Sequence, residues 1–150
     1  MNSELEIKLQ ADFPFMQRES TSVYGNIYRR WGCECGDGWY ALIYELCNEI
    51  TRAFEMEDKL VSIIVKQVKE KFGKLKFYYT FGDDLLFSDD ERDILLRSEI
   101  KKIVKAFEER STNTCEICGN DGHFRKDTII KSMCDNCYMK WLKKQKRKVD

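Results

Sequence analysis

Residues 115–118 and 134–137 read Cys-Glu-Ile-Cys and Cys-Asp-Asn-Cys, with fifteen residues between the two tetrapeptides. Two Cys-x2-Cys pairs at such a separation are typical of four-cysteine zinc sites. Each pair forms a turn whose sulfurs can reach one ion at about 2.3 Å, and two such turns complete a tetrahedron of thiolates. We therefore predict that Zn²⁺ is bound by Cys115, Cys118, Cys134 and Cys137. Four thiolates leave no coordination position open for a substrate, so the predicted zinc is structural.

The residues around the two cysteine pairs predict the local fold of this segment. We expect a zinc knuckle at 115–119, a short hairpin within 123–133 and a helix from the second pair through Leu142. This order resembles a treble-clef zinc finger, and a zinc ribbon is the alternative. His123 lies between the pairs, but four thiols are already available, so we expect a surface residue there. Structural zinc is worth about 10–16 kcal/mol in small fingers, so metal removal is expected to unfold this segment first.

A long amphipathic helix is predicted at about residues 38–56. Its apolar residues recur at helical spacing and form one continuous face: Trp39, Leu42, Ile43, Leu46, Cys47 and Ile50. Asp37 stands directly before it, where an N-cap side chain accepts a hydrogen bond from the first turn.

Two further helices are expected at residues 88–110 and 3–13, the second stopped by Pro14. Each opens on a Ser-x-x-Glu capping box, in which each side chain accepts a hydrogen bond from the other residue's backbone N–H. The boxes pair Ser88 with Glu91 and Ser3 with Glu6.

Residues 60–81 change from helical to strand periodicity. The first part is rich in β-branched residues, and Leu75, Phe77 and Tyr79 alternate with more polar ones. We predict a β-hairpin with its turn near Gly73. Its apolar face is expected to share a core with the second long helix, through Leu96, Ile100 and Phe107.

The predicted fold class is therefore α+β, with two long helices packed on a small antiparallel hairpin or sheet and a four-cysteine zinc finger after them. We place an α+β core domain at residues 1–111 and the zinc finger with its basic C-terminal helix at residues 112–150.

Lysine and arginine number 26, and aspartate and glutamate also 26, so the formal net charge is zero. Nucleic-acid binders usually carry a clear basic excess, so this balance argues against that class. The charge is unevenly distributed, however: residues 83–93 hold six acidic residues against Arg92, and residues 138–148 hold six basic residues and no acidic one. The six are Lys140, Lys143, Lys144, Lys146, Arg147 and Lys148.

Two interpretations of this basic segment stay open. The six cations could contact phosphates, with Tyr138 and Trp141 available for stacking on bases. Alternatively, they form a solvated helix end in which positive charge complements the helix dipole.

Gly-Asp-Gly-Trp at 36–39, Gln-Val-Lys-Glu-Lys-Phe-Gly-Lys-Leu-Lys-Phe-Tyr at 67–78 and the two cysteine pairs form a combination of motifs. Together they resemble a group of small proteins that bacteriophages and bacteria encode and that has no established activity. The resemblance covers most of the chain from Pro14 to Cys137. It implies an accessory protein of a phage or bacterium and assigns no catalytic role to any residue.

The first residues lack the apolar segment of a signal peptide, and no apolar run reaches the length of a membrane span. Seven cysteines, an odd number, together with a zinc pattern fit a reducing compartment. We therefore expect a cytoplasmic protein, in the host cytoplasm if a phage encodes it, with no membrane partner.

A possible functional loop precedes the first long helix and contains Cys33, Glu34, Cys35, Asp37 and Trp39. If the protein is an enzyme, Glu34 and Asp37 are the best candidates, since paired carboxylates can act as acid and base or bind a metal. The competing interpretation is that Asp37 caps the helix and Trp39 belongs to its apolar face, and we favour it.

Cys33, Cys35 and Cys47 allow two interpretations. They could form a partial metal site or a reactive thiol. No histidine lies nearby to act as a base, and Cys47 falls on the apolar face of its helix, so we favour buried cysteines that act as small hydrophobic residues.

Three functions follow from these features. The first is a non-enzymatic protein that binds another macromolecule, most plausibly a host or regulatory protein, through an exposed aromatic patch to which Tyr24, Tyr28 and Trp31 contribute. The alternative is nucleic-acid binding through the finger and the basic segment. An enzyme using Glu34 and Asp37, with Cys35 as a further candidate, comes last. The sequence leaves the oligomeric state open.

Overall fold

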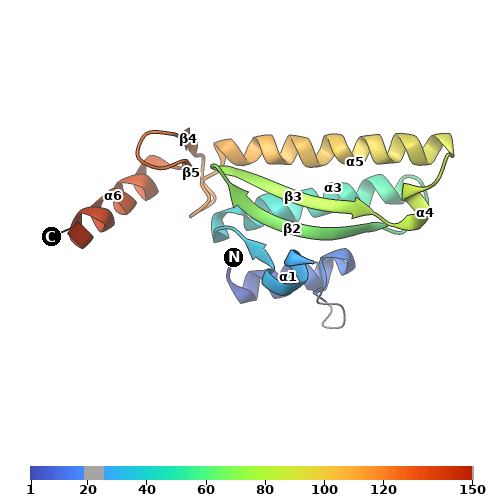
Figure 1. The fold of residues 1–150 in the computed structure, drawn as a ribbon, viewed down its shortest axis with the longest axis horizontal. Helices are drawn as coiled ribbons and strands as arrows, with labels where there is room; N and C mark the ends of the chain where they lie inside the picture. The colour runs from blue at the N-terminus through green and yellow to red at the C-terminus, as the bar shows by residue number, and fades with distance from the viewer. Residues whose placement is uncertain (19–25, 150) are drawn as a thin grey trace.

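A computed structural model describes residues 1–18 and 26–149 of the chain. Its body is a three-stranded sheet in the order β1–β2–β3, along which two long helices run, α3 (Tyr40–Glu55) and α5 (Glu91–Arg110). Figure 1 shows α5 along the β3 side of the sheet and α1 (Ser3–Asp12) beyond β2. The α+β class predicted from the sequence is confirmed.

The sheet is centred on the hairpin of β2 (Ile63–Lys71) and β3 (Lys74–Phe81). Phe72 and Gly73 form its two-residue turn, with φ of 51° and 77°. Positive φ at both central positions is the type I′ geometry, whose twist matches that of the two strands. The predicted hairpin and its turn are confirmed.

The third strand was not predicted. β1 comprises only Cys33–Glu34 and pairs in parallel with β2, where Cys33 lies opposite Val68. A strand of two residues is too short to show the alternation that predicts a strand, and its parallel partner lies far along the chain. Only the path of the chain brings these residues to the sheet edge.

All three predicted helix caps are wrong. Helix α3 begins after a 3₁₀ turn (Asp37–Trp39), and no side chain caps it. The side chain of Asn2 caps α1 in place of Ser3, and that of Asp90 caps α5 in place of Ser88. Capping residues recur close together at helix starts, and backbone dihedrals decide which of them is used.

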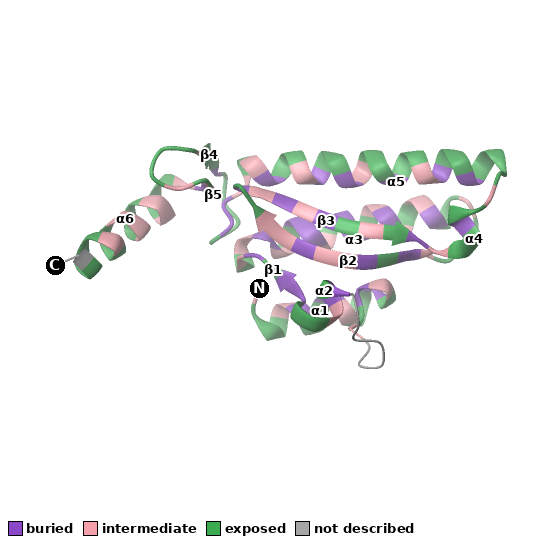
Figure 2. Cartoon of the chain, viewed as in Figure 1, coloured by how far each residue is buried: buried purple, intermediate pink, exposed green. Residues whose placement is uncertain are grey.

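The core lies between the hairpin and the two long helices. Figure 2 shows the buried residues of α5 on the side that faces the hairpin. Of the predicted core residues, Tyr79 is partly buried. The others are fully part of the buried core: Leu75, Phe77, Leu96, Ile100 and Phe107. The apolar face of α3 is buried as predicted, from Leu42 through Ile50.

Short elements complete the body: η1 (Pro14–Met16), α2 (Ile27–Trp31), α4 (Asp83–Leu86) and η3 (Ser111–Asn113). The cysteine segment then forms a two-stranded sheet, β4 (His123–Arg125) with β5 (Lys131–Met133), followed by helix α6 (Asp135–Val149). The hairpin and helix expected there are confirmed, and His123 is exposed. Figure 1 shows α6 pointing away from the body. Among the described residues, no helix is both long and apolar enough to cross a membrane.

Candidate metal centre

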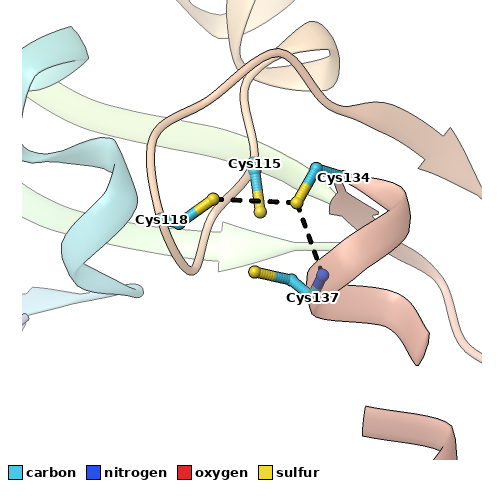
Figure 3. Close-up of side chains that lie close together, drawn as sticks. All are labelled: Cys115, Cys118, Cys134 and Cys137. Atoms are coloured by element: carbon cyan, nitrogen blue, oxygen red, sulfur yellow. Dashed lines mark hydrogen bonds between the residues drawn. The ribbon is translucent and has the colours of Figure 1, made fainter. Parts of the chain in front are cut away.

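Four sulfurs meet where the two cysteine turns face each other (Figure 3). The Sγ atoms of Cys115, Cys118, Cys134 and Cys137 all lie within 4.8 Å of one another, and those of Cys118 and Cys134 are 3.7 Å apart. Metal–sulfur bonds of about 2.3 Å in a tetrahedron place neighbouring sulfurs about 3.8 Å apart. The predicted ligand set is therefore brought together at a spacing that one metal ion fits.

Backbone hydrogen bonds shape the first cysteine turn. The N–H of Gly119 donates to the carbonyl of Cys115 at 2.9 Å, and the N–H of Cys115 donates to the carbonyl of Asn120 at 2.7 Å. Gly119 has a φ of 80°, a left-handed conformation that a side chain disfavours. The glycine thus allows the chain to turn back directly after Cys118.

The second pair lies at the start of α6. Cys134 immediately precedes the helix and Cys137 lies in its first turn, where its N–H donates to the Sγ of Cys134 at 3.4 Å. Free N–H groups at a helix start favour negative charge, and so favour thiolates there.

The pKa values of the Cys115 and Cys137 thiols are shifted in opposite directions. Burial alone raises the pKa of Cys115, but backbone hydrogen bonds from Cys134 and Cys118 outweigh it and lower the pKa to about 7. Burial and hydrogen bonding to Cys134 and the other thiols raise the pKa of Cys137 to about 12. A bound divalent cation neutralises adjacent thiolates, and a coordinating thiol is deprotonated outright.

The loop before α3 docks directly on the first cysteine turn. The N–H of Gly38 donates to the carbonyl of Glu116 at 2.9 Å. The indole N–H of Trp39 donates to the carbonyl of Thr114, also at 2.9 Å, and the Trp39 side chain is fully buried. The finger is therefore anchored to the body next to its metal ligands.

Gly38 is required for this close approach. A Cβ atom at position 38 would lie 2.3 Å from the carbonyl oxygen of Cys115 and 2.7 Å from the backbone nitrogen of Cys118. Both are backbone atoms, which cannot rotate away. Position 38 therefore accommodates only glycine while the loop and the first cysteine turn stay in contact.

Glu116, inside the first cysteine pair, is a structural residue that sequence analysis missed. Its carboxylate is buried, accepts a hydrogen bond from the N–H of Gly36 at 3.0 Å and pairs with Lys131 at 2.9 Å. Lys131 also pairs with Glu70 of β2 at 2.6 Å. Glu116 is the only charged residue between Arg110 and Asp121, and nothing in its sequence neighbours signals that the carboxylate is buried.

Glu34 and Asp37 have separate partners. Asp37 accepts hydrogen bonds from the backbone N–H of Asn2 at 2.7 Å and from its side-chain amide at 2.9 Å, and these bonds lower the pKa of the carboxyl. Glu34 is exposed and accepts a hydrogen bond from Gln67 at 3.1 Å. The prediction that Asp37 caps the first long helix is wrong, because its carboxylate binds Asn2 and joins the start of α1 to this loop.

Cys33, Cys35 and Cys47 are all buried. Burial raises the pKa of each thiol, that of Cys35 to about 12. Across the described residues, the only group with metal-ligand geometry is the C-terminal four, so these three form no such cluster. Protonated buried thiols fit the favoured interpretation of small hydrophobic residues.

The six basic residues of α6 are all exposed. Within the described part of the chain none of them has an ion-pair partner, and the acidic residue in the first turn of α6, Asp135, pairs with Arg125 instead at 2.5 Å. Beside them the rings of Tyr138 and Trp141 are stacked, with centroids 6.1 Å apart and planes at 10°. The guanidinium of Arg125 lies 4.2 Å over the Tyr138 ring.

The predicted aromatic patch before α3 is not formed as expected. Tyr28 is buried and its hydroxyl donates to the carbonyl of Met16 at 2.7 Å, so this residue belongs to the core. Trp31 is 59% exposed, and Tyr24 lies outside the described residues.

Comparison with protein-family models, with curated proteins and with solved structures found no match to this chain.

Proposed function

We propose that the four cysteines bind structural Zn²⁺ in a treble-clef-like finger. Support comes from the all-sulfur donor set and from the order of knuckle, hairpin and helix around it. The test is the metal content of the purified chain, with Co²⁺ substitution as a spectroscopic probe. We expect one zinc per chain and the visible absorption of tetrahedral Co²⁺–thiolate, both lost on changing Cys118 to Ser. A chain that folds fully without metal would refute the proposal.

The function we propose is that of a non-enzymatic accessory protein, encoded by a phage or bacterium, that binds nucleic acid in the cytoplasm through α6. The observation that carries it is the six exposed basic residues without ion-pair partners on a helix that points away from the body (Figure 1). Sequence analysis ranked a protein partner first, and the zero net charge argued against nucleic acid. The balancing acidic residues lie elsewhere, however, since residues 83–93 are at the opposite end of the body from α6.

The aromatic pair supports a nucleic-acid ligand in particular. Tyr138 and Trp141 lie on the same helix as the cations and are only partly buried. Stacking of a base on an aromatic ring contributes about 1–3 kcal/mol, whereas phosphate contacts supply the salt-dependent part of the affinity.

Fluorescence anisotropy with labelled single-stranded and double-stranded DNA and RNA tests this function. We expect binding at low salt and a logarithmic affinity that falls linearly with the logarithm of salt concentration. Changing Lys143, Lys144 and Arg147 to Gln should reduce the magnitude of the slope for duplex DNA by about 3, because each phosphate contact contributes about 0.9.

The matched control removes three cations of α5 instead: Lys101, Lys102 and Lys105. It changes the net charge equally and should leave most of the binding intact. Absence of binding to every probe at low salt would refute the proposed function, and an equal loss in both triple variants would remove α6 as its site.

A protein partner remains the second candidate, for a different reason from the predicted aromatic patch. The three most exposed large apolar side chains among the described residues come just after the ends of α3 and α4, which lie at the same end of the body (Figure 1): Leu60 at 92%, Met56 at 83% and Phe87 at 75%. Exposed apolar side chains gathered at one place often mark a protein-binding surface. Affinity capture with the wild-type chain and with Phe87→Ser tests it, and a partner that both retain equally would contradict this site.

A further inference from the structure

A groove of about 360 Å³ lies between the C-terminal half of α3 and the N-terminal half of α5. Its apolar lining comes from both helices: Ala53, Met56, Leu95, Leu96 and Ile103. Met56 is 83% exposed and Leu95 62% exposed, so apolar surface is open to solvent. The lining residues recur every three or four positions over about two turns of each helix, which is the spacing of ridges between which another helix packs.

The charged residues around the groove carry an acidic excess. Glu49, Glu57 and Glu99 face Arg52 and Lys102, and Glu49 already pairs with Arg52 at 3.0 Å. Helix α5, which lines the groove from Leu95 onward, begins at Glu91, directly after a segment with four exposed aspartates: Asp83, Asp84, Asp89 and Asp90. In the first turn of α5, Asp93 is paired with Lys59 at 2.8 Å.

Helix α6 has the complementary surface. Tyr138, Trp141 and Leu142 follow one another at helical spacing and form an apolar stripe, and Met139 beside them is 52% exposed. The basic residues 143–148 continue the same helix. An amphipathic helix that lays its apolar side into a groove, with opposite charges at the rim, is a recurring mode of recognition.

The groove and α6 of one chain are on different parts of the molecule. Figure 1 shows α6 beyond the end where α3 begins, whereas the groove lies toward the α4 end. The helix that matches the groove therefore belongs to another copy.

We propose that the groove between α3 and α5 is the docking site for α6 of a second copy of this chain. Trp141 and Leu142 lie on the apolar lining, and the basic half of the helix lies along the acidic end. Because groove and helix are different surfaces, the contact is head-to-tail and extends to further copies unless it closes into a ring. This inference gives a partner to the protein-binding candidate and rests on that candidate. It does not require nucleic-acid binding, with which it would compete for Trp141 and the basic residues of α6.

Sedimentation velocity of the full, zinc-loaded chain over a range of protein and salt concentrations is the test. We expect the average mass to rise with protein concentration at low salt and to fall when salt screens the charges. Two double variants reverse the charges: one carries Glu57→Lys and Glu99→Lys, and the other carries Lys143→Glu and Lys144→Glu. Each variant alone should be monomeric. Their equimolar mixture should associate again, because each variant then meets a surface of opposite charge.

The apolar part of the contact has a matched control. Leu95→Asp and Ile7→Asp change residues of nearly equal exposure, 62% and 65%, and only the first lies in the groove. Leu95→Asp should weaken self-association at least tenfold, with circular dichroism confirming the fold, and Ile7→Asp should leave it unchanged.

A wild-type chain that stays monomeric at every concentration would overturn the inference, as would equal effects of the two aspartate variants. Either result leaves the protein-binding candidate standing if Leu95→Asp or Phe87→Ser still abolishes capture of another protein. It leaves nucleic-acid binding standing if the anisotropy titration retains its salt dependence.

Discussion

Substituting Gly38 by Ala should destabilise this protein, although the same change usually does the opposite. Where the native backbone suits alanine, Gly→Ala stabilises by about 0.4–1 kcal/mol, because the unfolded chain loses freedom. Gly38 lies in a 3₁₀ turn that alanine could adopt. The new Cβ, however, would lie 2.3 Å from the carbonyl oxygen of Cys115, so the knuckle must move away.

The magnitude follows from the contacts that this movement breaks. The hydrogen bond from Gly38 to Glu116 and that from Trp39 to Thr114 are worth about 1 kcal/mol each, and a buried partner left unsatisfied costs about 1–3 kcal/mol. Loosened packing around the buried Trp39 adds to this loss. We expect a total of about 3–5 kcal/mol, and a melting temperature lower by about 10 °C for a chain of this length.

Thermal unfolding followed by circular dichroism measures the stability, and competition with a chromophoric chelator measures zinc affinity. Both should fall, because the displaced carbonyl belongs to a metal ligand. Gly82→Ala is the control: its new Cβ would meet the Ser62 hydroxyl and the Asp84 carboxylate, side-chain atoms that can move, far along the chain from the finger. A Gly38→Ala variant that keeps wild-type stability and zinc affinity would refute the docking of this loop on the knuckle.

Two further predictions concern acidity and thiol reactivity. The hydrogen bonds from Asn2 lower the pKa of Asp37 in the folded state, so their stabilisation is complete above the ordinary value of 3.8 and is lost as pH falls through the lower folded value. The difference in unfolding free energy between wild type and Asp37→Asn should therefore be present at neutral pH and shrink below about pH 4. Urea titrations at several pH values measure this difference. A difference that does not change with pH would contradict the prediction. Alkylation of the native chain after gentle chelation, read by mass spectrometry, should label Cys118, Cys134 and Cys137 before Cys33, Cys35 and Cys47, because the first three are at least partly exposed and the last three are buried. Early labelling of Cys35 would show that the loop opens.

The anchoring of the finger also changes what metal loss should do. The sequence predicted that the last quarter of the chain unfolds first. In the structure Thr114 and Glu116 bond to Trp39 and Gly38, so loss of the knuckle also removes partners from the buried start of α3. We expect chelation to lower the melting temperature of the body as well.

The features that the sequence predicted correctly are those with local causes. Two Cys-x2-Cys pairs predict one sulfur cluster because each turn is short, and the structure brings the sulfurs of Cys115, Cys118, Cys134 and Cys137 to within 4.8 Å of one another. The hairpin follows from alternation around a glycine turn, and the long helices follow from apolar residues at helical spacing. In each case the sequence pattern repeats at a short spacing along one continuous segment of the chain.

The features that depend on distant segments could not be predicted. β1 forms because the chain passes the edge of β2, and Glu116 is buried because the knuckle lies against Gly36 and Lys131. The role of Gly38 is likewise set by a backbone 77 positions away along the sequence, that of Cys115. The sequence by itself thus determined the cysteine cluster, the hairpin and the helices, because these follow from patterns with short spacing along the chain. Packing in three dimensions decided how the finger joins the body and where α6 points, because those contacts exist only once distant segments meet.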